Sequence, residues 1–335
     1  MQWKKGMPAL DLSALHDILV EDDEGNMQPM DQPYFKAKQI APGTWQVLSD
    51  GDHSYVIEGD DEVIVIDSGC GAGNIREFCQ SLVPGKPLTR LFNTHNHFDH
   101  TMNNYQFEVV YMSEKSYAGR CETFGDFEVL KDIPDDYPVV FLKDGDVINL
   151  KGRALEVFAI DEHREGSLQF LDRRERILFC GDELNGNFFD SQVSVEHSYR
   201  NLKRWASFRD AYDTLCAGNG IHDAAYVDRY LATAAYILNG HAHEGQEFYT
   251  PYMDRSPSVF EKDGKRVRAR RSPNMEGLSE ALRAAGFEEH LKYSGGKGCF
   301  CYMRKLCDDG IFDRQLEIND CRFCYYLNKS LFNIF

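Results

Sequence analysis

Short apolar runs separated by turn signals recur along the chain from residue 43 and predict a domain rich in β-structure. The first three strands are expected over 44–48, 53–58 and 62–66, with turns rich in Asp and Gly between them. The third run is continuously apolar, which is typical of a strand that is covered on both faces. A short helix is then expected over 74–82, because its apolar residues recur on one face.

Strands and helices continue to alternate after this opening. Further strands are expected over 87–93, 107–112, 139–142, 146–150, 154–160, 167–171 and 176–181, and further helices over 113–121, 199–212, 223–238 and 275–285. A closing β-hairpin is expected within 246–274, with its turn at Asp263-Gly264. The pattern therefore predicts a polar N-terminal extension (1–40), a main domain (41–274) and a C-terminal appendage (275–335).

The stretch that follows strand 87–93 concentrates side chains that can bind a metal. His95, His97, Asp99 and His100 fall within six residues. Alternate side chains of an extended segment share a face, so His95 and His97 point the same way, about 6–7 Å apart at the backbone. A turn or helix that begins at Asp99 places its carboxylate and His100 on a neighbouring position. Imidazole and carboxylate suit zinc, with iron and manganese as alternatives. The other interpretation is a polar turn that is rich in histidine.

This His-x-His-x-Asp-His sequence after a short apolar strand resembles the signature of the metallo-β-lactamase fold superfamily. The resemblance covers residues 40–270 and includes the opening strands, which end in Asp67-Ser68-Gly69. It implies an α+β fold, a four-layer αββα sandwich with its metal site where strand ends converge, followed here by a small α/β appendage. It also implies that Asp67 braces the ligand loop by hydrogen bonding.

Two later segments match further ligands of that family. His163 lies at a turn between two strands, although Asp161-Glu162 and Arg164 replace the Pro-Gly and Thr that usually surround it. Asp182 follows Gly181 at the end of strand 176–181, where the family has a carboxylate that bridges two metals. The resemblance therefore implies one complete metal position, made by His95, His97, His163 and Asp182.

The last ligand of the family, a histidine between a strand and a helix, is missing. Gly218 or Asn219 stands at its place, and neither residue type is a good zinc ligand. His222 is the nearest substitute, and His241 and His243 are others on a later loop. The second metal position, Asp99, His100 and Asp182, therefore borrows one of these histidines or is weak, and a single-metal enzyme remains an alternative.

The ligands that the resemblance implies predict a metal-dependent hydrolase, in which a zinc-activated water attacks a small-molecule ester, lactone, thioester or amide. Asp99 is the candidate catalytic residue, because a carboxylate beside the metal can orient the water or carry its proton. Two alternatives are an iron-loaded oxidoreductase on the same fold and a non-catalytic metal-binding protein with a degenerate second site.

Composition adjusts this picture in three ways. The chain has 335 residues and a formal net charge of −17, which argues against binding to nucleic acid. A basic stretch over 265–271 is an alternative nucleic-acid contact, but its alternation is also typical of a solvated strand face. No run of 18 apolar residues and no signal peptide are apparent, so we expect a cytoplasmic protein with no membrane span.

The ten cysteines fit free thiols in a reducing compartment. Those near the C-terminus, Cys299, Cys301, Cys307, Cys321 and Cys324, are irregularly spaced, so a second zinc site and buried thiols both remain open. The aromatic residues that follow them fit either packing on the main domain or a homodimer contact.

Overall fold

In the computed structural model, residues 35–49, 52–69, 74–120, 136–185 and 193–241 are described in full. Elsewhere only the backbone of short strands is described. The chain divides into two compact units. Unit 1 comprises Met1–Leu142, Ile148–Ala154 and Arg255–Lys292, and unit 2 comprises Lys143–Val147, Leu155–Asp254 and Tyr293–Phe335.

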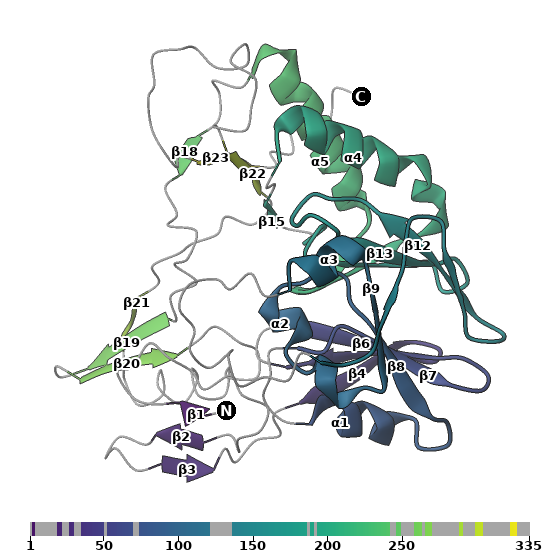
Figure 1. The fold of residues 1–335 in the computed structure, drawn as a ribbon. Coiled ribbons are helices and arrows are strands. Elements are labelled where there is room, and N and C mark those ends of the chain that lie inside the picture. Colours follow the sequence, from purple (N-terminus) through teal and green to yellow (C-terminus); the bar gives the residue numbers. More distant parts are fainter. Residues whose placement is uncertain are drawn as a thin grey trace. The chain divides into compact units, whose positions relative to one another are not determined.

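Unit 1 is organised around a seven-stranded mixed sheet with the order β10-β9-β8-β7-β6-β5-β4. Strands β4, β6, β7, β8 and β9 of this sheet are labelled in Figure 1. Its strands are β4 (Lys36–Ala41), β5 (Thr44–Leu48), β6 (His53–Glu58), β7 (Val63–Ile66), β8 (Leu88–Phe92), β9 (Val109–Met112) and β10 (Val139–Phe141). Neighbouring strands from β4 to β7 are antiparallel, and those from β7 to β10 are parallel. Parallel strands bring the ends of β7 and β8 to one edge of the sheet, which is where the histidine-rich stretch begins.

The core of unit 1 confirms the helix predicted after β7. Helix α1 (Ile75–Leu82) begins at Asn74, whose side chain accepts a hydrogen bond from the Glu77 backbone. Its Ile75 and Cys79 are buried in one core cluster with residues of β7. Every residue of β7 is apolar and buried. Two short helices follow, α2 (Phe98–Thr101) and α3 (Glu114–Ala118), with the 3₁₀ turn η1 (Asn104–Gln106) between them.

Unit 2 contains most of a second mixed sheet, with the order β11-β12-β13-β14-β16-β17. These strands are β11 (Val147–Asn149), β12 (Ala154–Ala159), β13 (Leu168–Asp172), β14 (Ile177–Gly181), β16 (Thr214–Ala217) and β17 (Gly220–Asp223). Strands β14 and β16 are parallel, and the other pairs from β12 to β17 are antiparallel. The hairpin β16–β17 precedes the helix expected over 223–238, and the sequence analysis did not predict it.

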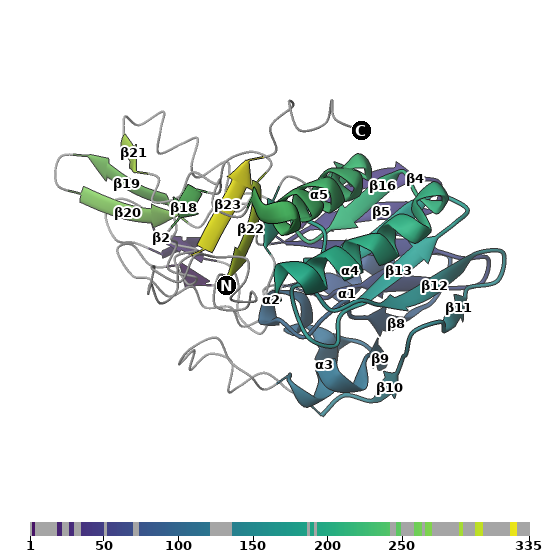
Figure 2. The same ribbon diagram turned by 90° about the horizontal axis from the view of Figure 1, so that it is seen from above.

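Helices α4 (Val195–Ser207) and α5 (Ala225–Tyr236) lie side by side over this sheet (Figure 2). Their apolar faces bury Leu202, Trp205 and Tyr230 against Leu178 and Leu215. The two mixed sheets with their helices confirm the α+β class. Among the helices that the structure describes, none is long and apolar enough to cross a membrane.

The remaining strands form small sheets that are described by backbone alone. One has the order β1-β2-β3, from β1 (Gln2–Trp3), β2 (Leu19–Glu21) and β3 (Met27–Pro29). The second has the order β20-β19-β21, from β19 (Ser258–Lys262), β20 (Lys265–Ala269) and β21 (Glu288–His290). The third has the order β15-β22-β23-β18, from β15 (Phe188–Asp190), β18 (Gln246–Phe248), β22 (Cys299–Met303) and β23 (Arg322–Tyr326).

The antiparallel pairing of β19 with β20 confirms the predicted hairpin. The helix predicted over 275–285 and the side chains of the C-terminal cysteines lie outside the described residues, as does most of the predicted extension.

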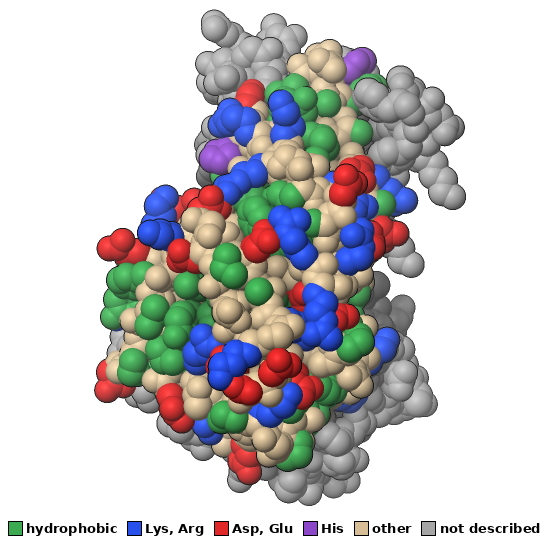
Figure 3. Space-filling model, turned by 90° about the vertical axis from the view of Figure 1, so that its right-hand side faces the viewer, with side chains coloured by type: hydrophobic (Ala, Val, Ile, Leu, Met, Phe, Trp, Pro, Cys, Tyr) green, Lys and Arg blue, Asp and Glu red, His purple; other side chains and the backbone are tan. Residues whose placement is uncertain are grey.

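The described surface carries charges of both signs. Figure 3 shows Lys and Arg side chains interspersed with Asp and Glu on one face. In unit 2 Arg173 contacts Glu156 at 2.6 Å and Arg209 contacts Asp228 at 3.2 Å. Such exposed pairs each contribute only ~0–1 kcal/mol. The fold therefore depends on its buried layers rather than on these ion pairs.

We expect Trp205→Ala to lower the free energy of unfolding by about 3–5 kcal/mol, because it empties a fully buried site between α4 and the sheet. Urea denaturation would measure the loss. Lys203→Ala, on the exposed face of the same helix, should stay within about 0.5 kcal/mol of the unchanged chain. Equal effects of the two substitutions would contradict this description of the core.

Candidate metal centre

The four predicted ligands of unit 1 lie on the segment that leaves β8 and enters α2. His95 precedes the helix, and His97 has an extended backbone (φ −66°, ψ 147°) at the residue before its first turn. Asp99 and His100 belong to α2 itself, so the predicted turn into a helix is confirmed. All four residues are buried, with at most 5% of each exposed. The His95 ring centroid lies 4.6 Å from that of His97 and 4.2 Å from that of His100.

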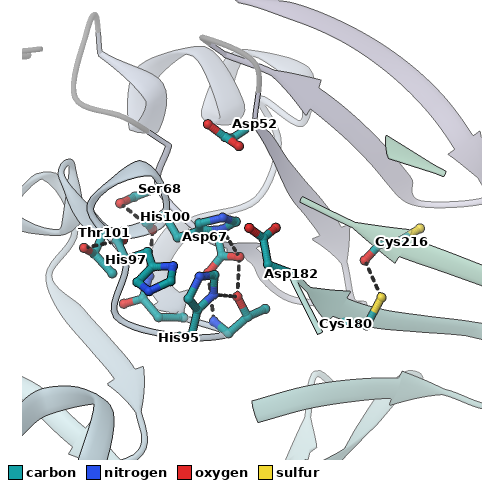
Figure 4. A network of polar contacts seen from close by, with 12 residues as sticks. Asp52, Asp67, Ser68, His95, His97, His100, Thr101, Cys180, Asp182 and Cys216 are labelled. Carbon is teal, nitrogen blue, oxygen red and sulfur yellow. Dashed lines mark hydrogen bonds and ion pairs between the residues drawn. The ribbon is translucent and has the colours of Figure 1, made fainter. Parts of the chain in front are cut away.

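Asp67 holds this segment in place, as the sequence predicted. Its carboxylate accepts hydrogen bonds from the Thr94 backbone N–H (2.8 Å) and the Thr94 hydroxyl (2.7 Å). Its Oδ2 lies 2.9 Å from Nδ1 of His100. Figure 4 shows His95, His97 and His100 gathered around this contact. An ionised carboxylate can only accept a hydrogen bond, so Nδ1 of His100 carries the proton and Nε2 keeps its lone pair for a metal.

The backbone of Asp67 is itself unusual, because its φ of 59° lies in the left-handed region. Asp adopts this conformation more readily than most residues other than Gly. The bend lets β7 end at Ile66 and turns the Asp67 carboxylate toward the end of β8. The backbone N–H of Asp67 donates to the Phe92 carbonyl at 2.9 Å, which ties the two strand ends together.

A second network fixes the backbone of His100. Its carbonyl accepts hydrogen bonds from the Ser68 backbone N–H (2.8 Å) and from the side chain of Asn93 (3.0 Å). The side chain of Asn104 accepts a hydrogen bond from the Ser68 hydroxyl (2.9 Å) and donates one to the side-chain oxygen of Asn93 (2.9 Å). The sequence analysis missed these residues, although polar side chains next to a histidine cluster were a signal that could have found them.

Asp52 is a further residue that the sequence analysis missed. It lies at the turn between β5 and β6, and one ligand atom each from Asp52, Asp99 and His100 lie within 4.8 Å of one another. Two of these three residues are fully buried and Asp52 is half-buried. This group is able to hold a metal ion.

In unit 2, His163 and Asp182 come together as predicted. His163 lies on the loop between β12 and β13, and Asp182 directly follows β14. His163 Nε2 lies 3.7 Å from Asp182 Oδ2, and the two side chains are 6% exposed. The sheet therefore presents one imidazole and one carboxylate at a single position.

The buried carboxylate of Glu183 holds the loop of His163. It accepts hydrogen bonds from three successive backbone N–H groups, those of Glu162 (2.7 Å), His163 (2.7 Å) and Arg164 (3.2 Å). Burial raises the pKa of Glu183 well above its usual range, although hydrogen bonds from Ser167 and the loop lower it. The sequence analysis missed this residue, which gives rigidity to a loop that lacks the family's Pro-Gly.

Helix α4 holds the same loop from the other side. Glu162 accepts hydrogen bonds from the Ser198 hydroxyl and from the Asn201 amide (2.7 Å). Asn201 also donates to the carbonyl of Asp161 at 2.6 Å. The charged residues Asp161 and Glu162, which depart from the family pattern, are therefore part of the structure that positions His163.

The place of the missing family histidine lies at the end of β16. Because β16 is parallel to β14, Gly218 and Asn219 follow it at the same sheet edge as Asp182, and the Gly218 N–H donates to the Gly181 carbonyl at 3.0 Å. The Asn219 side chain donates to the Asn185 carbonyl (3.1 Å), and its Oδ1 lies 2.7 Å from Nε2 of His222. Neither residue offers a good metal ligand.

His222 lies on β17 opposite Leu215, whose side chain belongs to the core beneath α4 and α5. Its ring lies 6.3 Å from that of Tyr226 in α5. Among the described residues it is in none of the groups of three potential ligand atoms within 4.8 Å of one another. His241 stacks on Tyr236, and His243 lies outside the described residues. A ligand role for His222 stays a prediction.

The described cysteines are Cys79, Cys180 and Cys216, and these are buried free thiols. The Cys180 thiol donates a hydrogen bond to the Cys216 carbonyl at 3.5 Å (Figure 4). Burial raises the pKa of the Cys79 and Cys180 thiols above their usual value, so these sulfurs are poor nucleophiles. This agrees with the prediction of free thiols for these positions.

Comparison with known proteins supports the resemblance seen in the sequence. Residues 50–211 match the family described as the metallo-beta-lactamase superfamily. Over 167 residues the chain is 29% identical to acyl-coenzyme A thioesterase MBLAC2 of Homo sapiens, a match that covers 41% of this chain and 60% of the relative. Over 97 residues it is 32% identical to hydroxyacylglutathione hydrolase of Francisella tularensis subsp. tularensis (strain WY96-3418), which covers 29% of this chain and 34% of the relative.

The solved structures agree on the fold. A β-lactamase domain protein from Burkholderia ambifaria matches with a TM-score of 0.50 and 15% identity, over 70% of this chain and 94% of that chain. The identity is too low to carry more than the fold. The chain spans 60% of the human relative and 34% of the bacterial hydrolase, so the activities of those whole proteins do not transfer directly.

We expect Asp67→Asn to weaken zinc binding about 10- to 100-fold with little loss of fold, because the amide cannot accept from Thr94 and hold His100 as the carboxylate does. Competition with a chromophoric chelator would measure the zinc dissociation constant. Asp172→Asn, a buried carboxylate at the end of β13 that accepts from Arg174 and Glu175, is the matched control for loss of a buried charge. Equal zinc affinity in both variants would contradict the role of Asp67.

Removal of the Glu183 carboxylate should disturb the loop of His163. We expect Glu183→Ala to cost about 1–3 kcal/mol of unfolding free energy, because three backbone N–H groups lose their acceptor. Glu183→Gln, which keeps one acceptor oxygen, should cost less. Glu175→Gln, in the β13–β14 turn, is the control. An unchanged midpoint of urea denaturation for Glu183→Ala would show that the loop does not depend on this carboxylate.

Proposed function

Because residues 50–211 of this chain belong to the metallo-beta-lactamase superfamily, we propose that the protein is a metal-dependent hydrolase that cleaves small-molecule thioesters. The observation that carries this proposal is the buried cluster His95, His97, Asp99 and His100, in which Asp67 holds His100 with Nε2 available. Imidazole nitrogens and carboxylate oxygens at a rigid strand end are donors that fit zinc.

The ligand sets follow the family pattern residue by residue. We assign His95, His97, His163 and Asp182 to one ion, and Asp99, His100 and Asp182 to a second. Iron and manganese are alternative metals, because the same donors bind them. The sequence also offers His222 as a ligand of the second ion. Its Nε2 instead contacts Oδ1 of Asn219, and this contact does not support a ligand role.

The chemistry follows from these donors. A bound zinc ion supplies a water with a pKa of about 7 and stabilises the negative charge that develops on a carbonyl oxygen. Asp99 is the residue that we assign to orient the attacking water and to accept its proton. Asp67 and Glu183 have no contact with substrate in this proposal. They position the ligand histidines, and the reaction depends on that geometry.

The choice of a thioester rests on the relatives. The human relative is named an acyl-coenzyme A thioesterase, and the bacterial relative is named a hydroxyacylglutathione hydrolase. Acyl-coenzyme A and acylglutathione are both thioesters, whose thiolate leaving group needs little protonation. Other esters, lactones and amides are the wider substrate class. We propose that the protein acts in the cytoplasm on a small-molecule substrate and does not bind nucleic acid. A homodimer is compatible with this proposal.

One observation favours a second candidate function. Gly218 has no side chain, and the Asn219 side chain is occupied by hydrogen bonds, at the place where the family has its last ligand. A protein that keeps one metal for binding alone, without hydrolysis, would have the same defect. The two candidates differ in turnover, because only the hydrolase cleaves a thioester.

Purified protein should contain zinc by elemental analysis and should hydrolyse an acyl-coenzyme A or an acylglutathione. We expect Asp182→Asn to lower kcat/KM at least about 100-fold, because it removes a metal ligand. Asp228→Asn, on the exposed face of α5, is the matched control and should leave kcat/KM unchanged. Metal-loaded protein without turnover of thioesters, esters or lactones would favour the binding protein, and iron in place of zinc would favour the oxidoreductase.

A further inference from the structure

We propose that Asp52 is a ligand of the ion that Asp99 and His100 hold, and that it supplies the donor missing at Gly218 and Asn219. This inference rests on the proposed function, because it requires a second metal position. The ligand set that the family resemblance implies does not include Asp52. The evidence lies within unit 1, and the first part of it is the register of the sheet.

Strand pairing brings Asp52 to the cluster although 46 residues separate it from Asp99. In the antiparallel pair β6–β7, Tyr55 faces Ile66, so the residues just before β6 lie beside those just after β7. In the parallel pair β7–β8, Ile66 faces Phe92, so the segment after β8 reaches the same edge. Three segments therefore converge there: the β5–β6 turn with Asp52, the end of β7 with Asp67, and the start of the histidine cluster.

The β5–β6 turn is held at this edge by specific contacts. The backbone N–H and the hydroxyl of Ser49 both donate to the Asp52 carbonyl, at 3.0 and 3.2 Å. Ser49 in turn packs against Gly69, where an added Cβ would lie 2.7 Å from the Ser49 hydroxyl. Gly69 also has a φ of 72°, so both its conformation and its close contact favour glycine. The turn is thus fixed to the segment that follows Asp67.

The distances suit a shared cation. Ligand atoms of Asp52, Asp99 and His100 lie within 4.8 Å of one another. Donors about 2.1 Å from one tetrahedral ion lie about 3.4 Å apart, so closure of the three atoms on an ion shortens their separations by at most about 1.4 Å. Figure 4 shows that Asp52 and His100 reach this region from separate segments of the chain.

Electrostatics also points to a cation. Asp52 and Asp99 place two carboxylates within 4.8 Å of each other, and Asp99 is only 1% exposed. Like charges repel more strongly where solvent is excluded, and a divalent cation between them turns the repulsion into attraction. Asp67 occupies Nδ1 of His100 with a hydrogen bond, which leaves Nε2 as the nitrogen that can join the two carboxylates.

The resulting donor set differs from that of the first ion. Apart from Asp182, which is assigned to both ions, the second ion has two oxygens and one nitrogen as donors. The first ion has three nitrogens, from His95, His97 and His163. Carboxylate-rich sites suit manganese better than imidazole-rich sites do. The second position is therefore expected to bind manganese more competitively against zinc than the first position does.

The test is metal stoichiometry and affinity, measured on the full chain with zinc chloride and manganese chloride as the probes. We expect the unchanged protein to bind two ions, and Asp52→Asn to keep one tight ion while its second dissociation constant rises at least about tenfold. Asp61→Asn, an exposed carboxylate on the β6–β7 turn of the same unit, is the matched control and should bind both ions normally. Thermal unfolding of the metal-free variants checks that each is folded.

Asp52→His provides an independent test, because it keeps a donor at this position but exchanges oxygen for nitrogen. We expect it to retain two ions and to shift the second position from manganese toward zinc. This result is measurable even if Asp52→Asn fails to fold. Two ions bound with unchanged affinity in Asp52→Asn, or a single ion in the unchanged protein, would overturn the role of Asp52 and leave the proposed function standing. Binding of no metal by the unchanged protein would overturn both.

Discussion

The hydrogen bonds of the Asp67 carboxylate are the interaction on which the histidine cluster of unit 1 depends. They join the end of β7 to the segment after β8, and they fix both the backbone of Thr94 and the ring of His100. A carboxylate that is 2% exposed would be costly to bury alone. Here Thr94 and His100 donate hydrogen bonds to it, and the left-handed backbone of Asp67 directs the carboxylate toward them. A residue of another shape or charge would lose both functions together.

Unit 2 uses the same physical solution with a different residue. Glu183 is also a buried carboxylate just after a strand. It too accepts hydrogen bonds from backbone N–H groups, those of the loop that carries His163. In each unit the acceptor comes from one strand end and the donors come from a neighbouring loop. A hydrogen bond from a backbone N–H restrains the main chain rather than a side-chain rotamer, so it sets the position from which a ligand starts. The loop of His163 lacks the proline of the family pattern, and these hydrogen bonds hold its backbone instead.

Much of this arrangement could be predicted from the sequence because its signals are local. The apolar run of β7, the cluster from His95 to His100 and the Gly181-Asp182 pair each identify themselves within a few residues. Asp52 and Glu183 gave no such signal. An aspartate in an Asp-Gly-rich turn looks like a turn residue, and it reaches the cluster only through the register of β6 on β7. Glu183 likewise looked like an ordinary surface acid until packing buried it. The β16–β17 hairpin was missed because β17 reads Gly-Ile-His-Asp and has no apolar run to identify it as a strand.

Substrate choice has a different structural origin from the chemistry. The family match ends at residue 211, and the ligands of the proposed centre lie inside it, apart from His222. Strand β15, which follows Asp182 within the matched region, pairs in parallel with β22, and β22 pairs with β23 from the C-terminal segment. The C-terminal segment is therefore joined by main-chain hydrogen bonds to the connection that leaves the Asp182 strand end. The two relatives are named for different thioesters, and the ligand types proposed here do not by themselves distinguish one thioester from another. The sheet that links β15 to β22 and β23 lies outside the ligand pattern, and it is where differences in specificity are to be sought.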